Sequence, residues 1–102
     1  CPDKNGEVKD VVLGFDTRAE YAGKDNPWFG ATCGRTCNRI RDGKYELDGE
    51  TIQLEKNEKK KINLHGGTKG WSHLYWHCEE VPNGVKFTRE SVDGENGYKG
   101  AV

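Results

Sequence analysis

The chain has 102 residues, of which 32% are apolar and 32% are charged, with 16 Lys and Arg against 17 Asp and Glu. This near-neutral balance excludes the clustered basic excess that nucleic acid or an anionic membrane surface favours. No apolar run approaches the roughly 18 residues that a membrane span needs, and no signal-peptide pattern is present. We therefore expect one small cytoplasmic domain, with a modest core and without nucleic-acid or membrane partners.

The first predicted element is a strand within residues 8–15. Val11, Leu13 and Phe15 alternate with other residues there, which is the period-2 pattern of a strand with one buried face. Residues 16–30 then become polar and rich in glycine, so we predict a loop that contains one helical turn at residues 18–21.

The clearest local signal is a hairpin in the segment KYELDGETIQL, residues 44–54. Asp48-Gly49 fits a two-residue type I′ turn, in which both central residues need a positive φ. This register sets Tyr45 opposite Ile52 and predicts one apolar face, which Leu47 and Leu54 extend.

A second hairpin is predicted after a solvated linker at residues 55–61. Leu74, Trp76 and Cys78 alternate on its first strand, and Val85 and Phe87 alternate on its second. Pro82-Asn83-Gly84 supplies the turn between them. Because no long helix is predicted and 14 glycines punctuate the chain, the fold class is all-β, as an antiparallel sandwich or barrel.

The four cysteines allow three interpretations. Cys33 and Cys37 have the spacing of half a zinc site, with His77 and Cys78 as an imaginable second half. That signal is weak, because His77 and Cys78 are adjacent on a strand and would face opposite sides. We expect buried, reduced thiols rather than a metal site or disulfides.

Several polar groups stand beside apolar or aromatic ones and are candidates for binding a ligand. They are Asn38, Arg39, His65, Trp71 and Asp93-Gly94. Sugar hydroxyls need planar donors and acceptors, and sugar C–H faces need an aromatic platform, so this mixture suits a carbohydrate. No nucleophile signature, P-loop or dinucleotide-binding pattern occurs.

Four segments in one order resemble the amino-terminal third of the aldose 1-epimerase family, whose members are also called galactose mutarotases. The segments are VVLGFDTRAEY, NPWFGATCGRTCNRI, LHGGTKGW and PNGVKFTRESVDGENGYKG. The resemblance covers almost the entire chain. It implies that residues 1–102 are the amino-terminal portion of one large antiparallel β-sandwich, completed by strands of the same chain or of another.

The resemblance also implies an activity without metal or organic cofactor. Family members interconvert the α and β anomers of free aldoses such as galactose and glucose through general acid–base ring opening. Asn38 and Arg39 match the family's sugar-binding pair, and His65 matches the histidine that supports the transition state. Gly66 and Gly67 are expected to turn the backbone tightly and leave room for the sugar. The acid histidine and base glutamate are expected beyond Val102.

The chain departs from the family pattern at Cys33 and Cys37, where aliphatic residues are commoner. Without the resemblance, Arg39 would be an ordinary ion-pair partner of Asp42, and His65 would be a strand-end residue. Two rival functions remain open. One is a hexose-phosphate epimerase, which needs an added Arg or Lys cluster that we do not expect here; the other is a non-catalytic carbohydrate-binding or structural subunit.

Overall fold

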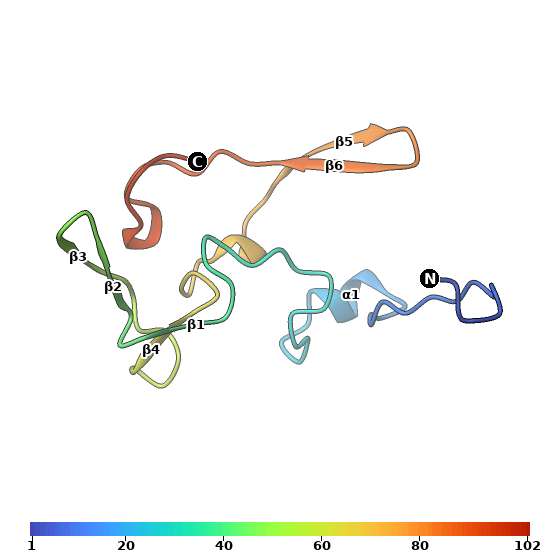
Figure 1. The fold of residues 1–102 in the computed structure, drawn as a ribbon, viewed down its shortest axis with the longest axis horizontal. Helices are drawn as coiled ribbons and strands as arrows, with labels where there is room; N and C mark the ends of the chain where they lie inside the picture. Colours follow the sequence, from blue (N-terminus) through green and yellow to red (C-terminus); the bar gives the residue numbers. More distant parts are fainter. The chain divides into compact units, whose positions relative to one another are not determined.

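The computed structural model describes residues 1–102, which form two compact units, Cys1–Ala31 and Thr32–Val102 (Figure 1). The first unit contains the helix α1, Arg18–Tyr21, and an isolated bridge between Pro2 and Val8. The second contains three two-stranded antiparallel sheets. None of the helices has the length and apolarity needed to cross a membrane.

The single turn of α1 begins where the sequence predicts it, and a capping box explains why. The Thr17 side chain accepts a hydrogen bond from the Glu20 amide at 3.3 Å, and the Thr17 amide donates to the Glu20 carboxylate at 3.0 Å. These reciprocal bonds satisfy two amides that a helix start leaves without partners. The Phe15 ring packs edge-on against Tyr21, with a centroid separation of 5.4 Å.

The strand predicted around Val11, Leu13 and Phe15 is wrong for this structure. Residues 9–15 form no strand, and Val11 and Leu13 are 63% and 69% exposed. The Val12 amide donates instead to the Asp10 carboxylate at 2.9 Å. A strand needs a neighbour to bond its backbone. Lys9 exchanges hydrogen bonds with Cys1, but residues 10–15 have no backbone partner. Alternation in the sequence shows a preference for one-sided burial but does not create a partner.

The second unit pairs strands that are close in sequence and also strands that are distant. The strand β1, Arg39–Arg41, pairs with β4, Ile62–Leu64. The strands β2, Lys44–Leu47, and β3, Glu50–Gln53, form one hairpin, and β5, His77–Val81, and β6, Gly84–Thr88, form another. Two 3₁₀ helices, Trp71–His73 and Glu95–Gly97, complete the elements. The prediction of an all-β fold is confirmed.

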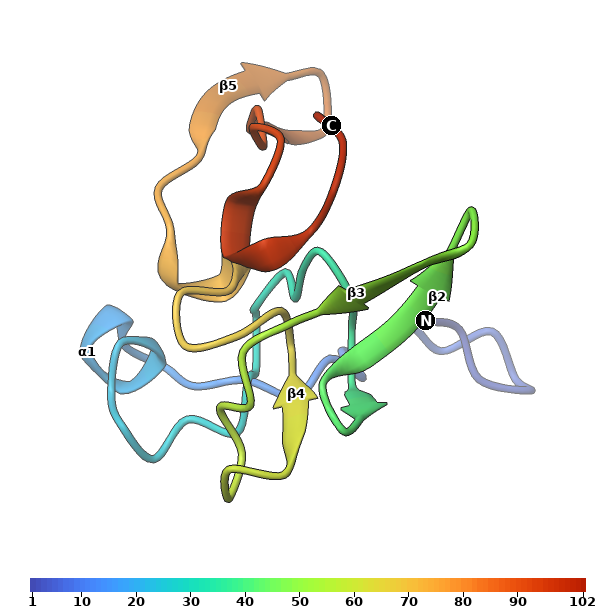
Figure 2. The ribbon, with the colours of Figure 1, turned by 90° about the vertical axis from the view of Figure 1, so that its left-hand side faces the viewer.

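The β2–β3 hairpin has the predicted register and turn. Tyr45 lies opposite Ile52, while Asp48 and Gly49 have φ angles of 52° and 81°. Two positive φ angles are what a type I′ turn requires, and this turn matches the twist of β2 and β3, which Figure 2 shows side by side. Of the expected apolar face, Ile52 is buried and Leu47 is 44% exposed.

The β5–β6 hairpin also forms, but it is shorter than predicted. Its first strand begins at His77, so Leu74 and Trp76 lie outside it, and Gly84 belongs to β6 rather than to the turn. The 3₁₀ helix explains the late start. It turns the chain at Trp71–His73, and the Trp76 indole then donates back to the Trp71 carbonyl at 3.1 Å.

A small core holds the second unit together. Ile52, Leu54 and Tyr98 are buried, and Ile40 and Tyr45 pack against them. A polar network adjoins this core, because the fully buried Asn63 donates to the Glu55 carbonyl at 2.8 Å and accepts from the Tyr98 hydroxyl at 3.3 Å.

Candidate functional site

The candidate site begins where β1 and β4 end together. Arg39 pairs with Leu64, and the next residues outward are Asn38 and His65. The His65 amide donates to the Asn38 carbonyl, and the Asn38 amide donates to His65 Nδ1, both at 3.0 Å. The φ angles of Asn38 and His65 are 64° and 52°, so both backbones leave the strand conformation here. Strand pairing thus joins two residues that are far apart in the sequence.

The hydrogen bond to Nδ1 selects the tautomer of His65. A ring nitrogen that accepts an N–H bond carries no proton, so the neutral imidazole has its proton on Nε2. We assign this proton from the hydrogen-bond geometry. Nε2 of the neutral ring is therefore a donor, which suits an oxygen acceptor.

The two glycines after His65 make the tight turn that was expected, with φ angles of 87° and 108° at Gly66 and Gly67. The expectation that they also leave room for a sugar is wrong for Gly66. A Cβ atom there would collide with the Gly34 carbonyl, so the backbone of residue 34 already fills that space. Gly66 is needed because two backbones approach each other closely.

Glu55 stabilises the residues after this turn. Its carboxylate accepts a hydrogen bond from the Thr68 amide at 2.7 Å and another from the Thr68 hydroxyl at 2.6 Å. The Thr68 bonds lower the pKa of Glu55. Sequence reasoning placed Glu55 in a solvated linker, because nothing local shows that its partner lies 13 residues further along the chain.

Arg39 is held by Glu58 rather than by Asp42. Its Nε donates to one Glu58 carboxylate oxygen at 3.0 Å and one terminal nitrogen donates to the other at 3.4 Å. A second terminal nitrogen donates to Asn38 Oδ1 at 3.1 Å. A guanidinium has five N–H donors, so these three bonds leave two for another partner.

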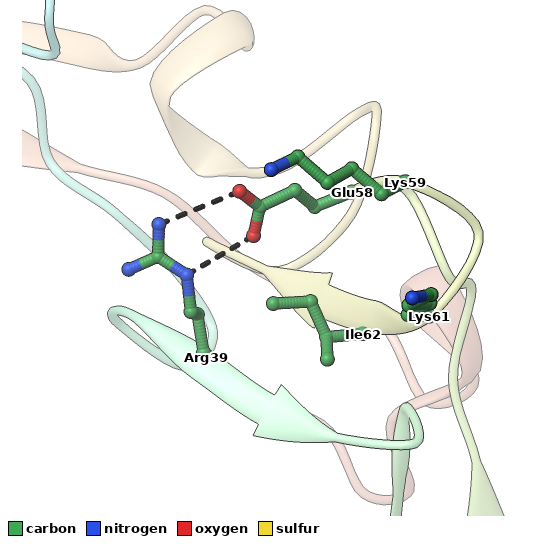
Figure 3. A pocket seen from close by; sticks show the side chains of 5 residues that line it. All are labelled: Arg39, Glu58, Lys59, Lys61 and Ile62. Atoms are coloured by element: carbon green, nitrogen blue, oxygen red, sulfur yellow. Dashed lines mark hydrogen bonds and ion pairs between the residues drawn. The ribbon is translucent and has the colours of Figure 1, made fainter.

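Arg39 and Glu58 line a pocket of about 300 Å³ (Figure 3). Lys59, Lys61 and Ile62 complete its lining. The expectation that this portion lacks a basic cluster is therefore wrong, because one arginine and two lysines surround the same space. Asn38 and His65 are not among the residues that line the pocket.

Cys33 and Cys37 lie beside His65. One ligand atom of each of these three side chains is within 4.8 Å of the others. Cys33 is partly buried, and its pKa is raised by burial and by the neighbouring Cys37 thiol. The predicted burial of the thiols is wrong, since Cys1, Cys37 and Cys78 are exposed; all four cysteines are free thiols.

Two candidates from the sequence have structural roles here. The Trp71 indole donates to Glu95 at 3.1 Å and packs edge-on against Trp76, with a centroid separation of 5.6 Å. Asp93 accepts a hydrogen bond from the Gly100 amide at 2.6 Å, and Gly94 has a φ of 81° in a turn. Trp71 and Asp93 are therefore already committed to partners within the chain.

The antiparallel strand pairs, with planar polar side chains gathered where β1 and β4 end, define a β protein with a polar candidate site. The chain belongs to the Aldose 1-epimerase family, whose profile matches residues 1–102. It is 46% identical over 100 residues to galactose mutarotase of Bos taurus, covering 98% of this chain and 29% of that protein.

Two solved structures resemble this one. An aldose epimerase homologue from C. elegans has 35% sequence identity and a TM-score of 0.74, over 98% of this chain and 30% of its own. Galactose 1-epimerase from Lactobacillus acidophilus NCFM has 28% identity and a TM-score of 0.72, over 88% of this chain and 27% of its own. The antiparallel β fold of this family is therefore shown, and the chain spans less than a third of the length of these relatives.

Proposed function

We propose that this protein is an aldose 1-epimerase, which interconverts the α and β anomers of free aldoses such as galactose and glucose. The observation that carries the proposal is the meeting of Asn38, Arg39 and His65 at the ends of β1 and β4 in a chain of this family. Similarity to proteins named galactose mutarotase supports the choice of substrate class.

His65 is the residue of this chain that acts closest to the chemistry. Ring opening of an aldose moves a proton from the C1 hydroxyl to a base and delivers one to the ring oxygen. Because the Asn38 amide occupies Nδ1 of His65, Nε2 carries the proton that stabilises charge on a sugar oxygen. We assign neither the general acid nor the general base to this chain.

Arg39 and Asn38 bind the sugar rather than react with it. The planar guanidinium offers two neighbouring donors to vicinal hydroxyls. Glu58 fixes the guanidinium from the opposite edge, and the Asn38 carboxamide oxygen fixes a third nitrogen. Both restraints lower the entropy that Arg39 loses when a sugar binds.

The test is polarimetry of freshly dissolved α-D-galactose with protein expressed from its full coding sequence. We expect accelerated mutarotation, with kcat/KM reduced about 100-fold or more in His65→Ala. Arg39→Ala should raise KM about 10- to 100-fold, the equivalent of losing charged hydrogen bonds. His73→Ala is the matched control, because His73 is exposed and lies outside the site. Sugar binding without acceleration would replace the proposal with a non-catalytic carbohydrate-binding role.

A second candidate, a hexose-phosphate epimerase, is favoured by the lysines around the pocket. Lys59 and Lys61 share their pocket with Arg39 and with Glu58, whose carboxylate already pairs with Arg39. The two lysines add positive charge that suits a phosphate better than a neutral sugar. The same assay with a hexose 6-phosphate separates the two candidates. A preference for the phosphate that is lost in a Lys59→Ala, Lys61→Ala double variant would favour the second.

A further inference from the structure

We propose that Cys33, Cys37 and His65 form a binding site for a soft divalent metal ion of the Zn²⁺ class. The three side chains come from two segments that strand pairing brings together, and their ligand atoms lie within 4.8 Å of one another. Two sulfurs and one imidazole nitrogen are the donor set that Zn²⁺ and Cd²⁺ prefer over Mg²⁺ or Ca²⁺.

The distances fit a tetrahedral ion after small side-chain movements. With Zn–S bonds of about 2.3 Å and Zn–N bonds of about 2.0–2.1 Å, two sulfurs lie about 3.8 Å apart and a sulfur and a nitrogen about 3.6 Å apart. The separations in the structure are no more than 4.8 Å. Contraction by about 1 Å is within reach of χ1 rotations of two short cysteine side chains.

The backbone around the site is already ordered by contacts that do not involve the thiols. The Gly34 carbonyl accepts a hydrogen bond from the Trp71 amide at 3.2 Å, and Gly66 packs directly on Gly34. Residue 34 lies next to Cys33, and residue 66 lies next to His65. The ligands are therefore presented by fixed segments, which lowers the ordering cost of binding.

The site is open to solvent on one side. Cys37 is exposed, while Cys33 and His65 are partly buried. Three protein ligands leave a fourth tetrahedral position, which a water molecule takes in sites of this kind. An exposed ligand also gives the ion a path of entry.

Metal binding must change the hydrogen bond between Asn38 and His65. Nδ1 of His65 now accepts the Asn38 amide. If the metal takes Nδ1, the lone pair that accepts this bond is used; if it takes Nε2, the proton moves to Nδ1, which can no longer accept. In both cases the Asn38 amide loses its partner, and the two thiols release their protons. Metal binding would therefore change the hydrogen bonding of Asn38, which lies next to Arg39.

The direct test is titration with Co²⁺ of reduced protein expressed from its full coding sequence, followed by the thiolate-to-metal charge-transfer absorption. We expect one Co²⁺ per chain, displaced by Zn²⁺. Cys33→Ser or Cys37→Ser should each weaken binding by at least about 100-fold, since even changes around metal ligands cost 10- to 100-fold. Cys78→Ser is the control and should bind as the wild type does, because Cys78 lies outside the cluster.

A second measurement covers the case in which a serine variant does not fold. In ¹⁵N-labelled wild-type protein, Zn²⁺ should shift the Asn38 amide resonance and speed its hydrogen exchange. Saturation with Zn²⁺ that leaves the Asn38 amide unchanged, or Co²⁺ absorption that persists in Cys33→Ser, would overturn the proposal. The proposal would also be overturned if the fully reduced protein bound no Co²⁺.

One consequence rests on the proposed function. If His65 serves the sugar, Zn²⁺ and sugar compete for it, so Zn²⁺ should inhibit mutarotation in the wild type and not in Cys33→Ser. Metal binding without inhibition would leave the metal site standing and remove His65 from the reaction. A protein that binds Co²⁺ but does not accelerate mutarotation would contradict the proposed enzymatic function and leave the proposed metal site standing.

Discussion

The two hairpins of the second unit have equally regular pairing and very different surroundings. In β2–β3, Ile52 is 4% exposed and the chain continues into the buried Leu54. In β5–β6, all ten residues are exposed, including Val85 at 50% and Phe87 at 62%. Turn residues and strand propensity therefore suffice to specify a hairpin, whereas burial depends on what the rest of the chain brings to it.

The turns of the two hairpins also differ, and the better turn again belongs to β2–β3. Asp48-Gly49 has two positive φ angles, whereas the second turn pairs Pro82 with Asn83 at a φ of 63°. Proline first and a positive φ second is the combination of a type II turn, which matches strand twist less well. The hairpin without a core contact thus also has the weaker turn.

The largest effect should come from removing the buried side chain that follows β3. Leu54→Ala leaves a cavity beside Ile52 and Tyr98, so the free energy of unfolding should fall by about 2–5 kcal/mol. Val85→Ala in the exposed hairpin should cost less than about 0.5 kcal/mol. Urea unfolding of both variants measures the contrast. A loss of about 2 kcal/mol in Val85→Ala would contradict it, and would mean that another segment or chain covers β6.

The next effect concerns Arg35, which holds the segment after β6 with polar contacts instead of burial. Its guanidinium donates to the Ser91 hydroxyl at 2.8 Å and to the carbonyls of Val92 at 2.7 Å and Gly100 at 2.6 Å. Arg35→Ala should therefore lower the free energy of unfolding by about 2–3 kcal/mol. Arg35→Lys should recover little of this, because an ammonium cannot span the same acceptors. Full recovery of the unfolding free energy in Arg35→Lys would show that the positive charge stabilises this segment and that the planar shape of the guanidinium does not.

A pH effect should follow from Glu95, near the end of the same segment. Hydrogen bonds from Ser91, then Trp71 and Arg89, lower the pKa of Glu95 below 4.5, although partial burial opposes them. A lowered folded-state pKa stabilises the fold above pH 4.5, and this contribution is lost as the pH falls through the folded pKa. Glu95→Gln should therefore flatten the acid limb of a plot of unfolding free energy against pH. The exposed Glu90→Gln is the control, and an equal flattening there would refute the assignment.

Local features were predictable from the sequence, and features that depend on distant partners were not. The turn at Asp48-Gly49 and the helical turn at residues 18–21 each depend on contacts within a few residues, so their signals are readable in the sequence. The prediction of a strand at residues 8–15 was wrong because alternation of apolar residues does not show which segment would pair with that strand. Residue type alone made Asn38, Arg39 and His65 candidates for binding a carbohydrate, but ordinary structural roles were favoured for Arg39 and His65 until the family resemblance reversed that preference.

The cysteine cluster also shows that the sequence does not reveal partners that are distant along the chain. The spacing of Cys33 and Cys37 indicates half of a metal site, with His77 and Cys78 as the only second half that the sequence suggests. The structure supplies His65 instead, through the pairing of β1 with β4. Only the register of two strands separated by a whole hairpin decides which histidine completes the group, and no local pattern encodes that register.

The smallest effect should come from matched cross-strand contacts on the two hairpins. In β5–β6, Lys86 lies opposite Glu79, with an ion pair of 3.0 Å between side chains that are 59% and 47% exposed. In β2–β3, Thr51 lies opposite Glu46 and donates to it at 2.6 Å. Double-mutant cycles to alanine should give coupling energies below about 1 kcal/mol for both pairs. The Lys86 coupling should fall in high salt and the Thr51 coupling should fall less, because salt screens a pair of charges more than a hydrogen bond from a neutral hydroxyl. Equal salt dependence would contradict this distinction between the two contacts, and coupling energies near zero for both pairs would mean that backbone pairing alone holds the exposed hairpin.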